Sequence, residues 1–466
     1  MTPRAPSRRV LGFLWLPVAT GLALLTCGTP PVEKAIEQRP NVLLILVDDL
    51  RPDLGAYGHP QVQSPEIDEL ASHGVRFERA YAQYPACNPS RVSLLTGLRP
   101  DTTGVLDNRT PFPSQLPHMV SLPQLFQDSG YFTASVGKVF HGSGRKGNRK
   151  ARKAWNLEAF PRTARRPAAR TDKLLPHGRL GRYSWRVASN GEKGLKDERV
   201  ASRAIEVLEQ VGRKEFFLAV GLTATHPHFV APARFFDLYP LDSIAPPPWR
   251  ETDMASQLAD LHGLSNEDSP VVSEREKKEL MRAYWACVSF VDAQVGRVLD
   301  ALDRLGLSGN TIVILVSDHG YHLGEQGWWS KRTLYEASTR IPLIIRAPGM
   351  ETPGRDSRQL VELVDVYPTL AELAGLEPPP GIEGLSMVPL LDDPDLDGKP
   401  AVFSQLTLGR VEGRSVRTAR WRYTEWIAGE RTVELFDYTA EPTETVNRAD
   451  DPELGDVRRR LGGLLQ

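Results

Sequence analysis

The chain has 466 residues, with 57 basic and 58 acidic side chains and a formal net charge of −1. A balance this close to neutral argues against a dedicated nucleic-acid-binding protein, which is usually clearly basic. The apolar fraction of 41% is that of a soluble globular protein, and the length suits one large domain or two smaller ones.

The beginning of the chain has the pattern of an export signal. Arg4, Arg8 and Arg9 precede an uncharged apolar run over residues 10–25. This run is shorter than the ~20 residues that a membrane-spanning helix needs. A basic start followed by an apolar run of this kind is typical of a secretory signal. We therefore expect an exported protein, either periplasmic or extracellular.

The apolar run ends in Leu24-Leu25-Thr26-Cys27-Gly28, which resembles the cleavage box of a bacterial lipoprotein. In that interpretation Cys27 carries a lipid, and this anchor is the only link to a membrane. An uncleaved anchor is the alternative. We predict a signal peptide over residues 1–27 and a linker over residues 28–40.

Four short apolar runs, rich in Val, Ile and Leu, end in polar residues. Such runs are typical of parallel strands that are buried on both faces. Helical patterns lie between several of them, as at Ser121–Gly130 and Asp197–Gly212. We predict an α/β fold in which helices sandwich a large mixed, mostly parallel sheet. The four runs are Asn41–Val47, Tyr131–Val136, Glu215–Val220 and Thr311–Val316.

The polar residues that follow these runs are candidates for a shared site. In open α/β sheets, ligands bind outside the carboxyl ends of the strands. We therefore expect the clusters at one edge of the sheet. They are Asp48 with Asp49, Lys138 with His141, His226 with His228, and Asp318 with His319.

Residues 392–399 have the composition of a domain boundary. A main domain over 41–391 and a smaller C-terminal α+β subdomain over 392–466 are predicted. In the subdomain we expect three short strands and a closing helix, at Ala401–Ser404, Gly413–Arg422, Val433–Asp437 and Asp451–Leu465.

The segment Gly144–Lys173 carries an excess of positive charge, with eleven Lys or Arg against two acids. It follows directly on the cluster of Lys138 and His141. A solvated loop is one interpretation of such a segment. A basic rim that attracts a polyanionic substrate is the other.

Asp48 and Asp49 indicate a metal site. Two adjacent carboxylates repel each other unless a cation lies between them, and oxygen ligands favour Ca²⁺ or Mg²⁺. Asp318 and His319, which end another predicted strand, can complete the ligand set. The alternative is a pair of helix-capping aspartates.

Cys87-Asn-Pro-Ser-Arg91 has the pattern of a helix start. Pro89 suits the first turn, and we expect the helix over residues 89–96. Cys87 then lies at the N-terminus, where free N–H groups favour a thiolate. Arg91, one turn further, offers a planar donor for an oxyanion. The alternative for Cys87 is a small packing residue.

Four further side chains add positive or titratable groups around the same edge. Each has an alternative as a structural or exposed residue, although Lys138 and His228 each follow a buried run closely. In Thr223-Ala-Thr-His-Pro-His228 we select the histidine after the proline, with His226 as the alternative. The four are Lys138, His141, His228 and Lys331.

Taken together, these motifs resemble the type I sulfatase family. Cys87-Asn-Pro-Ser-Arg91 with the following Leu95-Thr-Gly97 is similar to the family signature, and the other clusters follow in the family's order. The resemblance covers roughly residues 40–450. Within the family, segments such as Val47–Pro52 and Gly137–His141 are most similar to the iduronate-2-sulfatase group.

The resemblance implies an alkaline phosphatase-like fold and hydrolysis of a sulfate ester on a sulfated carbohydrate. A uronate 2-O-sulfate of a glycosaminoglycan-like substrate is the favoured case. It also implies that a formylglycine-generating enzyme converts Cys87 to formylglycine. One hydroxyl of the hydrated aldehyde attacks sulfur, and loss of the proton from the second then releases sulfate.

The resemblance also assigns roles to individual residues. Ca²⁺ would be held by Asp48, Asp49, Asp318, His319 and converted Cys87. Arg91 and Lys138 would orient the nucleophile, and His141 would take the proton from its second hydroxyl. His228 and Lys331 would hold the sulfate and help to protonate the leaving oxygen.

Three other functions remain open. A phosphate or phosphonate ester hydrolase of the alkaline phosphatase superfamily is the first. An inactive binder of sulfated polysaccharide is the second, and it applies if Cys87 is not converted. A cysteine hydrolase is the third, but it would leave the paired carboxylates without a role.

Overall fold

The computed structural model describes residues 1–2, 39–111, 116, 118–142, 152–161, 172–174, 184–188, 191–212, 214–247 and 273–465. The predicted signal peptide, Cys27 and most of the linker lie outside these residues, as does most of the basic segment 144–173. Residues 39–466 belong to one compact unit. Within the described part of the chain, no helix has the length and apolar character to cross a membrane.

The predicted apolar runs form the centre of the main sheet. β1 (Asn41–Val47) pairs in parallel with β9 (Thr311–Ser317) on one side and with β7 (Phe216–Leu222) on the other. β7 pairs in parallel with β3 (Phe132–Gly137). Every residue of β1, β7 and β9 is buried, as expected for strands covered on both faces. The predicted parallel core is therefore confirmed.

The outer strands make the sheet mixed. Among the described residues it has nine strands, in the order β12-β2-β13-β9-β1-β7-β3-β4, with β14 paired to β2. β13 is antiparallel to both β9 and β2. The outer strands are β2 (Val75–Tyr81), β4 (Leu157–Ala159), β12 (Arg340–Ile341), β13 (Leu343–Arg346) and β14 (Arg355–Glu362).

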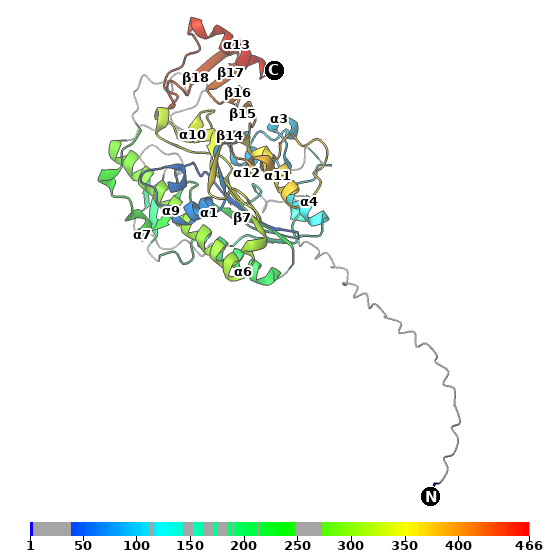
Figure 1. The fold of residues 1–466 in the computed structure, drawn as a ribbon. Coiled ribbons are helices and arrows are strands. Elements are labelled where there is room, and N and C mark those ends of the chain that lie inside the picture. Colours follow the sequence, from blue (N-terminus) through cyan, green and yellow to red (C-terminus); the bar gives the residue numbers. More distant parts are fainter. Residues whose placement is uncertain are drawn as a thin grey trace. The chain divides into compact units, whose positions relative to one another are not determined.

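Helices cover the two faces of this sheet, and the alternation of β1 shows why. Leu43, Ile45 and Val47 pack into one core cluster, whereas the intervening residues of the strand pack into another. The first face is covered by α1 (Pro65–Ser72), α6 (Lys196–Val211) and the long α9 (Glu274–Arg304) (Figure 1). The second is covered by α2 (Cys87–Thr96), α4 (Leu122–Asp128), α11 (Val366–Leu373) and α12 (Val388–Asp392).

The C-terminal part is a separate antiparallel sheet closed by α13 (Gly455–Gly463), drawn in orange and red in Figure 1. Its strands follow in chain order and are β15 (Ala401–Leu408), β16 (Val411–Thr418), β17 (Trp421–Ala428) and β18 (Glu430–Asp437). The segment 413–422, expected as one strand, instead contains most of β16, the turn at residues 419–420 and the start of β17. An α+β subdomain is nevertheless what the structure has.

Short elements complete the described fold. A small sheet joins β5 (Asp172–Leu174), β6 (Ser184–Ala188) and β8 (Phe229–Pro232), and a hairpin joins β10 (His322–Leu323) to β11 (Trp329–Ser330). The remaining short helices are α3 (Pro100–Thr103), α7 (Ala233–Phe236) and α10 (Glu336–Thr339).

Candidate active site

The site begins where β1 and β9 end. The two strands are in parallel register, with Val47 opposite Ser317, so the next residues of each strand lie side by side. Those residues are Asp48 and Asp318, and both are buried. Asp49 follows in the left-handed region, at φ 60°, and its N–H donates to Oδ1 of Asp318 at 3.1 Å. The predicted acidic cluster therefore forms one buried group.

Arg91 joins the two strand ends from α2. Its Nε donates to Asp318 Oδ2 at 2.7 Å, and Nη2 donates to Asp48 Oδ1 at 3.0 Å. Nη1 donates to the carbonyl oxygens of Lys138 and Val139. The guanidinium is fully buried, and four of its five N–H donors have partners in the protein. Arg91 therefore orients the carboxylates and has little donor capacity left for a substrate.

Cys87 is the first residue of α2, two residues before the expected start. Its Sγ lies 3.4 Å from the Nζ of Lys331 and 3.5 Å from the Nε2 of His319. The side chain is only 1% exposed. The structure thus brings the signature cysteine to the end of β9, although 232 positions separate it from His319.

The charges around Cys87 favour its thiolate. Burial and the neighbouring Asp48 oppose ionisation, whereas Lys331, Lys138 and a hydrogen bond with His141 favour it, and the net result is a pKa of Cys87 well below its ordinary value. Burial also lowers the pKa of each lysine, but the surrounding negative charges, led by Asp48 at Lys138 and by Asp49 at Lys331, together more than offset it. Both lysines therefore have raised pKa values and stay charged.

Lys138 and Lys331 each pair with a different carboxylate of the acidic group. The Nζ of Lys138, which follows β3, donates to both oxygens of Asp48 at 2.7 and 2.6 Å. The Nζ of Lys331 donates to Asp49 Oδ1 at 2.5 Å. Lys331 follows β11 directly, and its neighbours Ser330 and Arg332 both have positive φ, at 79° and 78°. The backbone therefore has an unusual conformation on both sides of Lys331, the residue that enters the site.

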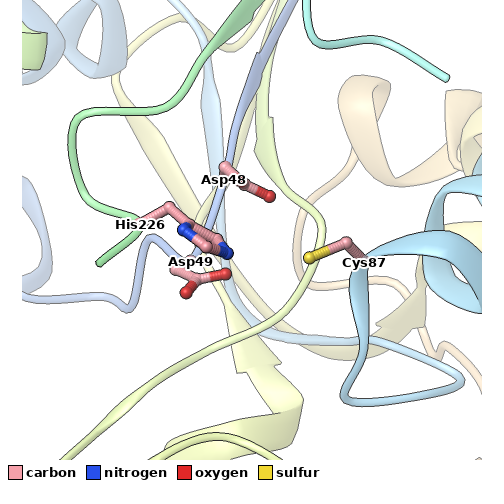
Figure 2. A group of neighbouring side chains, drawn as sticks. All are labelled: Asp48, Asp49, Cys87 and His226. Carbon is pink, nitrogen blue, oxygen red and sulfur yellow. The ribbon is translucent and has the colours of Figure 1, made fainter. Parts of the chain in front are cut away.

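The structure distinguishes the two histidines of the loop after β7. His226 belongs to the group in which Asp48, Asp49 and Cys87 offer ligand atoms within 4.8 Å of one another (Figure 2). His228, the residue selected from the sequence, is exposed, and its Nδ1 hydrogen-bonds to the hydroxyl of Ser184 on β6. The geometry therefore brings the alternative, His226, into the cluster.

His141 is also close to residue 87. Its hydrogen bond contributes to the lowered pKa of Cys87. It lies beyond β3, in the turn that follows Lys138. Together with Lys138, it brings the second predicted cluster to the edge where β1 and β9 end.

Two positioning residues were not expected from the sequence. Asp197, in the first turn of α6, accepts from the backbone N–H groups of Thr223 and Ala224 at 2.7 and 2.6 Å. Thr225 donates its hydroxyl to the carbonyl oxygen of Asp48 at 2.5 Å. These contacts fix the loop that leads to His226. The sequence marks Asp197 only as an acid at a helix start and gives no sign of a partner 26 residues away.

The arrangement fits a divalent cation. Asp49 Oδ2 is buried and has no hydrogen-bond partner among the described residues. A second group, Cys87, Asp318 and His319, also offers three ligand atoms within 4.8 Å of one another. Carboxylate-rich sets of this kind suit a hard cation such as Ca²⁺ better than a soft one. The donor set therefore agrees with a metal held between the two strand ends and residue 87.

Comparison with known proteins gives the class to which this fold and site belong. The Sulfatase family model matches residues 40–376, and the model "N-sulphoglucosamine sulphohydrolase, C-terminal" matches residues 324–466. The chain belongs to the sulfatase family and is a sulfuric ester hydrolase.

Individual relatives agree with this assignment. Iduronate 2-sulfatase of Homo sapiens is 32% identical, over 98% of this chain and 99% of that protein. Among solved structures, a 2-O GAG sulfatase superposes with a TM-score of 0.70 at 25% identity, covering 92% of this chain and 91% of that one. A phosphonate monoester hydrolase of Agrobacterium radiobacter has a TM-score of 0.78 at 23% identity, covering 92% and 95%. This last likeness concerns the fold alone.

Proposed function

We propose that this sulfatase removes the 2-O-sulfate from a uronate of a glycosaminoglycan-like substrate. The proposal rests on the similarity to iduronate 2-sulfatase along nearly the full length of both chains, and on the likeness to a 2-O GAG sulfatase. The observation that carries the chemistry is the meeting of Cys87, Lys331 and His319 at the ends of β1 and β9. Export to the periplasm or cell exterior, with a possible lipid at Cys27, is part of the same proposal.

In this proposal residue 87 is formylglycine, which supplies an oxygen nucleophile and is regenerated in each cycle. Because Cys87 is only 1% exposed in the folded chain, the modifying enzyme must reach it before folding is complete. Pro89 and Arg91 are buried as well, so the segment around Cys87 is accessible to the modifying enzyme only before the chain has folded.

Asp48, Asp49, Asp318, His319 and residue 87 would hold Ca²⁺. When bound, the ion neutralises charge on a sulfate oxygen and lowers the pKa of the attacking hydroxyl. Arg91 keeps Asp48 and Asp318 in place, as its hydrogen bonds to both indicate. Removing that guanidinium would take a charged partner from each of two buried carboxylates.

Lys138 and Lys331 both supply positive charge close to residue 87. Their raised pKa values keep both ammonium groups charged at neutral pH, so that they can stabilise the negative charge that develops on sulfate oxygens. His141 is placed to accept a proton from the oxygen at residue 87.

His226 is the better placed histidine to protonate the leaving oxygen. Burial lowers the pKa of His226, but the carboxylates of Asp49 and Asp48 and a hydrogen bond with Cys87 raise it, and the net result is a pKa above the ordinary value. A histidine with a raised pKa keeps its proton at neutral pH and can donate it. We therefore assign to His226 the role that the sequence gave to His228.

The test is the release of inorganic sulfate from a panel of defined substrates. The panel pairs a 2-O-sulfated uronate disaccharide with its 6-O- and N-sulfated counterparts, an aryl sulfate and a phosphonate monoester, and Cys87→Ala is the control. We expect kcat/KM to be at least about tenfold higher for the 2-O-sulfate, a difference of about 1.4 kcal/mol in transition-state binding. Faster turnover of another sulfate position or of the phosphonate would contradict the proposed specificity.

A further inference from the structure

The turn that carries Asp49 is held in place by a tyrosine from a distant helix. Asp49 lies at φ 60°, a left-handed conformation that side-chain-bearing residues seldom adopt. Its carbonyl oxygen accepts a hydrogen bond from the hydroxyl of Tyr284, on α9, at 2.8 Å. The same hydroxyl accepts from the N–H of Arg51 at 3.0 Å. One phenol oxygen therefore bridges two peptide groups of the turn.

The other N–H groups of the turn are held by the end of β9. The N–H of Asp49 donates to Asp318 Oδ1 at 3.1 Å, and that of Leu50 donates to the hydroxyl of Ser317 at 2.9 Å. The side of the turn that faces β9 is thus tied to the second acidic cluster. Tyr284 holds the peptide groups of Asp49 and Arg51 on the side that faces α9.

Tyr284 is itself rigidly placed. It is fully buried, and its ring stacks on Tyr321, with centroids 5.6 Å apart and planes 12° apart. Phe229 meets the same ring edge-on at 5.7 Å. A tyrosine hydroxyl can donate one hydrogen bond and accept another, which is how Tyr284 joins the two peptide groups.

The turn has to hold the buried carboxylate of Asp49 in position. One oxygen of Asp49 is engaged by Lys331, and the other is buried without a hydrogen-bond partner in the described part of the chain. A residue in the left-handed region reverts to a commoner conformation unless its surroundings fix it. Such a reversion would turn the carboxylate away from residue 87.

We propose that Tyr284 is a positioning residue for the divalent cation, which acts by holding Asp49 in its left-handed conformation. Tyr284 does not touch the reacting atoms, and its effect passes through the backbone of Asp49. This inference rests on the proposed metal site, and it adds a residue that belongs to neither ligand group.

The test compares two Tyr→Phe variants that each remove one hydroxyl. Tyr284→Phe is the test variant. Tyr57→Phe is the matched control, because the Tyr57 hydroxyl likewise accepts from a backbone N–H and donates to a carbonyl, both of Leu343, at 2.8 and 3.1 Å. Each protein is stripped with a chelator and titrated with Ca²⁺ in a calorimeter, and the melting temperature is recorded with and without the ion.

Without calcium, we expect the melting temperature to fall by a similar amount in the two variants. Only Tyr284→Phe should bind Ca²⁺ more weakly, by about tenfold, as expected from the loss of one or two hydrogen bonds. If Tyr284→Phe does not fold, Ser317→Ala releases the N–H of Leu50 in the same turn and is expected to weaken binding similarly. The inference alone would be overturned if Tyr284→Phe bound Ca²⁺ as tightly as the wild-type protein does, or if Ser317→Ala, used in its place, did so. If the wild-type protein did not bind Ca²⁺, the proposed metal site would be overturned, and the inference with it.

Discussion

The ammonium nitrogen of Lys331 lies 3.4 Å from the sulfur of Cys87, although 244 positions separate the two residues in the chain. Lys331 directly follows the hairpin of β10 and β11, whose Leu323 and Trp329 pack in the first core cluster, whereas Cys87 starts α2, which packs in the second. The site is therefore assembled from segments that only the complete fold brings together.

The first prediction concerns the metal. Asp49→Asn keeps the shape of the side chain but removes one negative charge from the ligand group. We expect Ca²⁺ affinity to fall at least about a hundredfold, with turnover falling in parallel. Asp53→Asn is the control, since Asp53 is also buried nearby but pairs with Arg51. Calorimetry and sulfate release measure both effects, and an Asp49→Asn protein with full activity would remove the metal from the account.

The second prediction separates the two histidines after β7. His226→Ala is expected to lower kcat/KM about a hundredfold or more, whereas His228→Ala should cost less than about tenfold. The loss should be larger for a sugar sulfate than for an activated aryl sulfate, because a good leaving group needs less help from an acid. A larger loss in His228→Ala would instead support the choice made from the sequence.

The third prediction concerns the C-terminal sheet. Trp426 of β17 packs in one cluster with Tyr84 and Ala86, just before Cys87, and with Trp328 and Leu334, on either side of Lys331. Trp426→Ala should cost about 3–5 kcal/mol of unfolding free energy, and it should also lower kcat/KM at temperatures where the protein stays folded.

Trp421→Ala is the matched control for that prediction. Trp421 lies on the same strand but packs in a different cluster, with residues of the C-terminal subdomain. We expect a comparable loss of stability in thermal or denaturant unfolding, with kcat/KM nearly unchanged. Equal losses of kcat/KM in the two variants would mean that the C-terminal sheet does not position the site.

The fourth prediction is a pH dependence of stability. Burial raises the pKa of Glu434 from 4.5 to about 7. The folded chain therefore binds a proton that the unfolded chain loses, so this contribution to stability is full below pH ~4.5 and is lost as the pH rises through about 7. Glu434→Gln has no proton to lose.

We expect the unfolding free energy of Glu434→Gln, relative to that of the wild-type protein, to rise by about 2.5 kcal/mol between pH 5 and pH 8. Denaturant unfolding at several pH values measures this difference directly. A difference that stays constant over that range would show that Glu434 has an ordinary pKa in the folded chain.

The central strands could be predicted because their apolar runs are nearly uninterrupted. β17 could not, since the segment around it contains arginines that look exposed in the sequence. Arg422 is in fact buried and pairs with Glu336 and Glu444, at 2.6 and 2.7 Å. β2 was missed for a similar reason, because Val75-Arg-Phe-Glu-Arg-Ala-Tyr81 alternates charged and apolar residues at the outer part of the sheet.

In the site, too, some residues could be predicted from the sequence and others could not. The acidic pairs and Cys87 could be placed together because each ends a strand or begins a helix at a known edge of the sheet. His226 and His228 could not be distinguished, because they lie in an irregular loop whose spacing fixes no direction for a side chain. The roles of Asp197 and Tyr284 depend on contacts between distant segments, which leave no pattern in the sequence.

The central claim is that residue 87 is converted and that its oxygen performs the attack. Mass spectrometry of the peptide that contains residue 87, taken from protein with measured sulfatase activity, tests it most directly. We predict an aldehyde at this position, present in proportion to the specific activity of each preparation. Fully active protein with an unmodified Cys87 thiol would contradict the account.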